Sequence, residues 1–165
     1  MKTSINDLSI LSSSVIAVPP LCRNNDYSIN LEENRRLIKH LESGGVQTLL
    51  YGGNANLYNI AISEYSELLE MLESESGDQT LAIPSVGPFF GNIADQAAIL
   101  KGSSFPAVMI LPTLFPARSE GVAQAVRHFV ERSGIKAVLY IKDESYVSPR
   151  IVSELVQDGI ISWIK

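Results

Sequence analysis

The sequence predicts an α/β protein built on a parallel β-sheet. Short apolar runs that end at proline, glycine or polar residues indicate buried strands. Segments with apolar residues at helical spacing lie between these runs, and each is long enough for one helix. A strand followed by a helix recurs five times along the chain, and a sixth strand follows the fifth helix. This repeat favours short β-α-β crossovers, which place successive strands side by side in parallel.

The first half of the chain supplies three of the expected strands. They are residues 13–18, 46–51 and 80–86. A helix from Leu31 to about Ser43 follows Asn30, a residue type that caps helices well, and ends at Gly44-Gly45. A second helix begins at Ser63, and a short third one covers residues 92–101.

The second half continues the same alternation. The expected strands are residues 105–111, 135–141 and 160–164. One helix begins at Ser119 and ends at Gly134, and another begins at Ser148-Pro149, where the first turn tolerates proline. The regular spacing of all six strands places the chain firmly in the α/β class.

Bulk composition describes an ordinary globular protein of one domain over residues 1–165. Hydrophobic residues make up 45% and charged residues 19% of the chain, and the formal net charge is −5. The negative charge argues against nucleic acid or a membrane surface as a partner. The single cysteine, Cys22, excludes an internal disulfide and fits a reducing compartment. Residues 10–20 are too short and too serine-rich for a membrane span or a leader, so we expect a cytoplasmic protein.

Two parallel architectures fit this pattern of elements. A complete (β/α)8 barrel takes about 250 residues, so the length favours an open, doubly wound sheet of six strands. The loop after the first strand, however, lacks the G-x-G-x-x-G motif of dinucleotide-binding sheets, and no G-x-x-x-x-G-K-[ST] motif occurs. Length and motifs therefore point in different directions.

The last strand ends on a lysine. Residues 159–165 (GIISWIK) are almost wholly apolar until Lys165. The carboxyl ends of parallel strands are where α/β folds place their chemistry. Lys165 is therefore a candidate functional residue, as is any polar residue that follows a neighbouring strand.

Five segments carry a further pattern. Residues 52–56 (GGNAN) follow the second strand, residues 112–121 (PTLFPARSEG) the fourth, and residues 139–146 (LYIKDESY) the fifth. Ser148-Pro149 begins the next helix, and the last strand ends in Lys165. In this order they resemble the dihydrodipicolinate synthase / N-acetylneuraminate lyase family of pyruvate-dependent class I aldolases. The corresponding family motifs are G-T-T-G-E, P-Y-Y-N-x-P-S-Q-E-G, L-Y-N-V-P-x-R-T, S-P-E and G-I-K-[DE].

The resemblance runs from about Val15 to Lys165 and implies a (β/α)8 barrel of the TIM type, of which the chain covers about the first six strands. Such an incomplete barrel leaves its first and sixth strands as unpaired edges. We therefore expect that the chain is part of a longer protein or that it completes itself by association. The family also implies a homo-oligomer, a dimer or a tetramer.

The resemblance assigns roles to five residues. Lys165 aligns with the lysine that forms a Schiff base with a 2-oxo acid, such as pyruvate or a sugar-derived keto acid. Tyr140 aligns with the tyrosine that shuttles protons at the reacting carbonyl. Gly52, Gly53 and Asn54 align with the segment that holds the carboxylate of the substrate, where two glycines allow a backbone nest. The implied chemistry uses no cofactor and no metal ion.

Three positions depart from the family pattern. Gly53 replaces a threonine that links the catalytic tyrosines, Leu114 replaces the second relay tyrosine, and Ser145 replaces the arginine that holds a distal carboxylate. These changes argue against dihydrodipicolinate synthesis itself and leave a lyase, aldolase or dehydratase acting on a 2-oxo acid. A catalytically impaired relative with a binding or regulatory role is the alternative. An unrelated small-molecule-binding domain with an open sheet is a third hypothesis.

Overall fold

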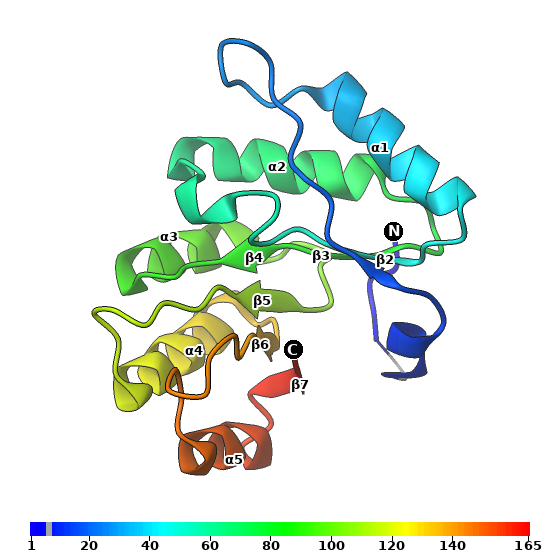
Figure 1. The fold of residues 1–165 in the computed structure, drawn as a ribbon. Coiled ribbons are helices and arrows are strands. Elements are labelled where there is room, and N and C mark those ends of the chain that lie inside the picture. The colour runs from blue at the N-terminus through cyan, green and yellow to red at the C-terminus, as the bar shows by residue number, and fades with distance from the viewer. Residues whose placement is uncertain (6–7) are drawn as a thin grey trace. The chain divides into compact units, whose positions relative to one another are not determined.

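The computed structural model describes residues 1–5 and 8–165 (Figure 1). The chain divides into two compact units. The first unit comprises residues 1–84 and 104–106, and the second comprises residues 85–103 and 107–165. Each unit combines a parallel sheet with helices, as the sequence predicts. Among the described residues, no helix is long and apolar enough to cross a membrane.

The first unit holds a three-stranded parallel sheet in the order β1-β2-β3. Its strands are β1 (Ile16–Ala17), β2 (Thr48–Leu50) and β3 (Leu81–Ile83). Its helices are α1 (Leu31–Ser43) and α2 (Ile62–Glu75), with short 3-10 helices at η1 (Leu8–Ser12) and η2 (Leu57–Asn59). All residues of β2 and β3 are buried, which explains why both strands are wholly apolar except for Thr48.

The second unit holds a four-stranded parallel sheet in the order β4-β5-β6-β7. Its strands are β4 (Ser85–Val86), β5 (Val108–Ile110), β6 (Ala137–Leu139) and β7 (Ile161–Ile164). Its helices are α3 (Phe90–Leu100), α4 (Ser119–Ser133) and α5 (Pro149–Gln157). Apolar side chains of these helices, such as Phe129 and Leu155, are fully buried.

The strands are shorter than the sequence predicts, and the third one is divided. The expected strand at residues 80–86 forms β3 and β4, which are separated by Pro84 and pair with β2 and β5 respectively. Proline has no N–H to donate to a sheet ladder, so it interrupts the strand. The described residues therefore form seven short strands where the sequence predicted six. The helices α2 and α3 begin at Ile62 and Phe90, one and two residues earlier than expected.

Strand order within each unit agrees with one of the two architectures that the sequence left open. In both units the strands follow one another in chain order, each pairing in parallel with the next. Consecutive parallel pairing is the arrangement of a (β/α)8 barrel.

Helix boundaries follow the predicted capping residues. The Asn30 side chain accepts a hydrogen bond from the Glu33 N–H at 2.9 Å, which caps α1 as expected. Pro149 occupies the first turn of α5, also as expected. Gly87 lies between β4 and α3 with φ +93°, and its N–H donates to the buried Gln96 side chain at 2.8 Å. Only glycine adopts that backbone conformation without strain.

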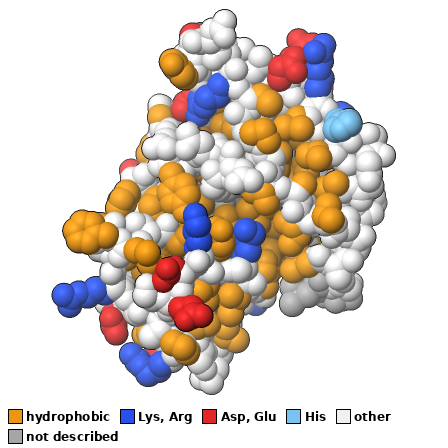
Figure 2. Space-filling view, viewed as in Figure 1, with side chains coloured by type: hydrophobic (Ala, Val, Ile, Leu, Met, Phe, Trp, Pro, Cys, Tyr) orange, Lys and Arg blue, Asp and Glu red, His pale blue; other side chains and the backbone are white. Residues whose placement is uncertain are grey.

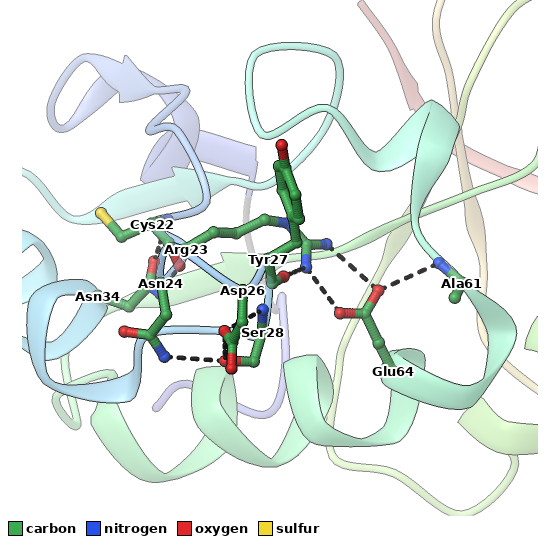
Figure 3. A network of polar contacts seen from close by, with 9 residues as sticks. All are labelled: Cys22, Arg23, Asn24, Asp26, Tyr27, Ser28, Asn34, Ala61 and Glu64. Atoms are coloured by element: carbon green, nitrogen blue, oxygen red, sulfur yellow. Dashed lines mark hydrogen bonds and ion pairs between the residues drawn. The ribbon is translucent and has the colours of Figure 1, made fainter.

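The loop after β1 is braced by polar contacts within the first unit (Figure 3). Arg23 forms an ion pair with Glu64 of α2 at 2.6 Å and also donates to the carbonyl of Tyr27. The buried Asn34 side chain bonds to both the N–H and the carbonyl of Cys22, at 3.0 and 2.9 Å. These contacts fix the loop at the carboxyl end of β1.

Some large apolar side chains of the second unit remain exposed. They are Phe89, Phe90, Leu114, Phe115, Val156 and Ile164. Apolar side chains are correspondingly prominent on the face of the molecule that Figure 2 shows. Leu114 and Phe115 belong to the loop after β5, and Phe89 belongs to the loop after β4, so the apolar surface includes loops that follow strands.

One carboxylate ties the end of α1 to the start of β3. Glu42 accepts hydrogen bonds from the Gly77 N–H at 2.7 Å and from the Thr80 hydroxyl at 2.6 Å, and it pairs with Lys39 at 3.3 Å. Partial burial opposes ionisation of this group. The hydrogen bonds and the ammonium outweigh burial, so the pKa of Glu42 lies below its usual range.

Replacing Glu42 with glutamine will destabilise the chain. We expect a loss of about 1–2 kcal/mol in the free energy of unfolding at neutral pH, because two charge-assisted hydrogen bonds are weakened. A carboxyl pKa that is lower in the folded than in the unfolded state stabilises the fold above the unfolded value, near 4.3. That contribution disappears as the pH falls through the folded value.

Urea denaturation of wild type and Glu42→Gln between neutral and acidic pH measures this effect. The difference in the free energy of unfolding between the two proteins is expected to become smaller as the pH falls. Glu70→Gln serves as the control, because Glu70 is an exposed carboxylate of α2 without a hydrogen bond or ion pair in the described part of the chain. A gap that stays constant down to acidic pH contradicts the assignment.

Candidate active site

The register between β6 and β7 decides which side chains meet at the end of the sheet. Ala137 pairs with Ile161, but Val138 pairs with Trp163 and Leu139 with Ile164. Ser162 therefore has no partner, and the register shifts by one residue at this bulge. A one-residue shift exchanges the two faces of a strand. Without the bulge, the residues of β7 after Ser162 would point to one face of the sheet. With the bulge, each of them points to the other face.

The ladder continues past β7 to its last residue. The Lys165 N–H donates to the carbonyl of Leu139, and the Ile141 N–H donates to the carbonyl of Lys165, both at 2.9 Å. In a parallel ladder these two bonds place Lys165 directly beside Tyr140. Side chains of such a pair point to the same face.

Lys165 and Tyr140 are in direct contact. The Lys165 ammonium lies 4.1 Å from the centre of the Tyr140 ring, within the range of a cation–π interaction. Tyr140 is half-buried and Lys165 is exposed. The two side chains that the sequence predicts at the ends of adjacent strands thus lie together at the carboxyl end of the second unit's sheet. An amine beside a phenol combines a nucleophile with a proton donor.

The other three predicted residues belong to the first unit. Gly52, Gly53 and Asn54 follow β2 and precede η2 (Leu57–Asn59). The Asn54 side chain donates to the carbonyl of Val18, at the end of β1, at 3.4 Å. The segment is thereby held at the carboxyl end of the first unit's sheet.

The backbone of the two glycines is not left-handed. Neither Gly52 nor Gly53 has a positive φ, so neither takes the left-handed place in a nest that alternates right-handed and left-handed residues. A Cβ added to Gly53 would meet the Tyr58 ring at 3.7 Å, an ordinary van der Waals contact. Neither backbone conformation nor packing requires glycine at position 53.

Tyr51 immediately precedes this segment and is fully buried. Burial raises the pKa of its phenol above the usual range, and the neighbouring Cys22 adds to the rise. Burial therefore favours the neutral form of the Tyr51 phenol.

Two hollows of the second unit lie among the loops that follow its strands. One of about 280 Å³ is lined by Pro112, Thr113, Leu114, Lys142, Asp143 and Tyr146. The other, of about 190 Å³, shares Thr113 and Tyr146 with it, and its remaining walls include Phe89 and Arg118. Both hollows are thus formed by the segments that follow β5 and β6, and the smaller one also by the segment that follows β4.

Sequence reasoning did not single out Tyr146. This tyrosine is buried and lines both hollows. In the hollow of about 280 Å³ the lining also includes Leu114, the residue at the position of the family's second relay tyrosine. The signal for it was weak, because Tyr146 lies in a polar loop rather than at the end of a strand. Ser145, at the position of the family's arginine, donates to Asp143 through its N–H at 2.8 Å and its hydroxyl at 2.5 Å. Ser145 therefore braces its own loop.

Comparison with curated proteins finds two related dehydratases. The chain is 24% identical over 152 residues to a probable 5-dehydro-4-deoxyglucarate dehydratase of Rhizobium meliloti, covering 90% of this chain and 50% of that protein. It is 20% identical over 147 residues to a probable enzyme of the same name from Bacillus subtilis, covering 88% of this chain and 48% of that protein. The chain spans about half the length of these curated relatives. No model of a known protein family matches the chain.

Comparison with solved structures finds the same fold. Dihydrodipicolinate synthase from Bacillus clausii matches with a TM-score of 0.77 at 20% identity, covering 91% of this chain and 51% of that one. A prophage protein of the dihydrodipicolinic acid synthase family from E. coli K12, in complex with pyruvate, matches with a TM-score of 0.81 at 12% identity, covering 94% and 54%.

The resemblance to the dihydrodipicolinate synthase / N-acetylneuraminate lyase family is confirmed. It extends to sequence, through the two dehydratases, and to fold, through the two solved structures. Like the sequence motifs, these matches cover most of this chain and about half of each relative. The family fold places its strands consecutively around a barrel, as the strand order of both units requires.

Substitution of Gly53 by alanine will leave stability almost unchanged. The φ angle at position 53 is not positive and the added Cβ has room, so we expect a change within about 0.5 kcal/mol. Gly45→Ala is the matched control, because Gly45 has φ +85° and alanine there is strained by about 1 kcal/mol. Urea denaturation measures both. A loss at position 53 equal to that at position 45 would contradict the geometry.

Proposed function

We propose that the chain carries the nucleophile and the proton donor of a Schiff-base lyase that acts on a 2-oxo acid. The observation that carries the proposal is the contact between the Lys165 amine and the Tyr140 ring at the carboxyl end of adjacent parallel strands. Barrel enzymes bind their substrates at the carboxyl ends of their strands. The family resemblance supplies the reaction class.

In the proposed reaction, the neutral Lys165 amine attacks the ketone carbon of the substrate. The resulting carbinolamine loses water, and the Tyr140 hydroxyl transfers the protons that this exchange requires. The carbon next to the protonated imine then breaks one of its other bonds, and the imine accepts the electron pair of that bond. In an aldolase, a base removes the proton of the substrate hydroxyl, the carbon–carbon bond breaks to release an aldehyde, and the enamine that remains is protonated back to the imine. In a dehydratase, the neighbouring carbon loses a proton to give the enamine, which then expels the hydroxyl group as water with the help of an acid. Water finally hydrolyses the imine and frees Lys165.

The names of the curated relatives favour a dehydratase. The names specify a deoxyglucarate as the substrate of those proteins. A deoxyglucarate is a sugar acid with a carboxylate at each end. We propose a sugar-derived keto acid of this kind in preference to pyruvate alone. The departures at Leu114 and Ser145 support this choice, since they remove two residues that the family uses for dihydrodipicolinate synthesis.

Gly52, Gly53 and Asn54 are proposed to hold the substrate carboxylate. Their support is the position after β2, together with two exposed residues at 53 and 54. We further propose one partial-barrel domain over residues 1–165, a homo-oligomer, and a cytoplasmic location. These proposals rest on the family resemblance and on composition.

A catalytically impaired relative is the second candidate. Its support is that Ser145 bonds within its own loop and that leucine stands at the relay tyrosine's position. Such a protein binds a 2-oxo acid without turning it over. It therefore differs from the first candidate in covalent chemistry.

Borohydride trapping separates the two candidates. Incubation with pyruvate and sodium borohydride is expected to add the mass of one pyruvate, less one water and plus two hydrogen atoms, at Lys165. Lys165→Arg abolishes the adduct, because a guanidinium stays protonated. Lys136→Arg is the control, since Lys136 directly precedes β6 and so lies at the amino-terminal end of the strands, opposite to Lys165. Peptide mass spectrometry locates the adduct.

Tyr140→Phe tests the proton shuttle. We expect it to slow adduct formation by about 10²-fold or more while the adduct still forms on Lys165. Ligand binding without any adduct in the wild-type chain would exclude the lyase and favour the impaired relative.

A further inference from the structure

The bulge in β7 re-aims a second side chain besides that of Lys165. Trp163, the single tryptophan of the chain, pairs with Val138 in the ladder. Val138 and Tyr140 lie two residues apart and therefore share a face, which Lys165 shares because it lies beside Tyr140. In a regular ladder Trp163 would instead point to the same side as Ile161. The structure thus turns Trp163 to the face that carries the proposed nucleophile.

The contacts of β5 show which face this is. Ile110 lines the smaller hollow together with Ile93 of α3, so the side chain of Ile110 points toward the helices. Met109 is the preceding residue of the strand and points to the other side. Met109 pairs with Val138, which pairs with Trp163, so these three side chains lie on the face of the sheet opposite to α3.

Trp163 is the partly exposed member of this row of side chains. Met109 and Val138 are fully buried, whereas Trp163 is half-buried. An aromatic side chain carries about 150–250 Å² of surface that burial can remove from water. A half-buried indole next to a reactive amine therefore offers an apolar contact surface to a bound ligand.

Trp163 occupies the layer of side chains directly beneath Lys165 and Tyr140. Each residue of a parallel strand adds about 3.3 Å, so the two layers are separated by about 6.6 Å. The side chains inside a parallel barrel stack in such layers. The Lys165 ammonium lies over the Tyr140 ring, 4.1 Å from its centre. The indole thus closes, from the amino-terminal side, the space in which a ketone can reach Lys165.

The size of the residue at this position decides how deep that space is. The family motif G-I-K-[DE] has a glycine two residues before the lysine, and this chain has Trp163 there. A glycine leaves the layer beneath the lysine open, whereas an indole fills it. Groups on the carbons next to the ketone consequently meet an aromatic floor in this chain.

We propose that Trp163 is a specificity-determining residue that restricts the ligand at Lys165 to 2-oxo acids whose carbon next to the ketone is unbranched. The inference rests on the proposed function for the position of the ketone. The indole packs against that carbon and excludes a methyl or larger branch on it. Its role is steric, so another aromatic ring can replace it and a small side chain cannot.

Titration calorimetry with two matched acids tests the assignment. The probes are 2-oxobutanoate and 3-methyl-2-oxobutanoate, which differ by one methyl branch next to the ketone. We expect wild type to bind the unbranched acid about tenfold or more tightly, the usual effect of one carbon atom in a closely fitting site. Trp163→Ala reduces this preference to about twofold or less, chiefly by improving the binding of the branched acid. Trp163→Phe keeps most of the preference.

Ile164→Ala is the matched control. Ile164 is the next residue of β7, and it pairs with Leu139 on the helix side of the sheet. It is also partly exposed, so its truncation loosens the same strand without opening the floor. The control keeps the preference of wild type. A preference that Ile164→Ala also removes, or that Trp163→Ala leaves intact, overturns the proposal.

The emission of the single tryptophan gives a second readout that needs no substitution. Saturating 2-oxobutanoate is expected to shield Trp163 of the wild-type chain from quenching by acrylamide, because the ligand covers the indole. Unchanged quenching at saturation overturns the proposal even if Trp163→Ala fails to fold. A wild-type chain that binds neither acid overturns it as well.

Failure of this proposal is distinguishable from failure of the Schiff-base proposal. Shielding of Trp163 by 2-oxobutanoate in a chain that forms no borohydride adduct supports the aromatic floor and excludes the lyase. An adduct at Lys165 without shielding of Trp163 supports the lyase and excludes the role of Trp163.

Discussion

The register between β6 and β7 is the constraint on which the candidate site depends. Without the bulge at Ser162, Lys165 would lie beside Ile141 and its side chain would point away from Tyr140. The bulge shifts the ladder by one residue, and two backbone hydrogen bonds then hold Lys165 opposite Tyr140. Bulges recur beside active sites because they re-aim single side chains. Here one unpaired serine brings an amine to a phenol.

The rest of the second unit surrounds that pair. The loops after β5 and β6 lie at the same carboxyl end of the strands, and their side chains line the hollow of about 280 Å³. Lys142 and Asp143 both line that hollow, and Asp143 accepts two hydrogen bonds from Ser145. The proposed nucleophile and the proposed proton donor come from two adjacent strands. Their meeting follows from strand order and register more than from any single motif.

Sequence alone predicted the α/β class, the capping of α1 by Asn30, and the meeting of Tyr140 with Lys165. Apolar periodicity and helix capping depend on residues that are close together in the sequence, so they can be predicted without knowledge of the tertiary structure. The division of the third strand at Pro84 was predictable in principle, since proline cannot donate within a sheet. The bulge at Ser162 was not, because no glycine or proline marks it. The pairing of Ser145 with Asp143 and the burial of Tyr146 also depend on loop geometry that periodicity does not encode.

Lys165 and Tyr140 share one face at the end of adjacent strands. Nuclear Overhauser spectroscopy of the isotopically labelled chain measures this proximity. Cross-peaks are expected between the ε-methylene protons of Lys165 and the ring protons of Tyr140. Cross-peaks from that methylene to the Ile141 side chain, with none to Tyr140, would contradict the register and with it the site.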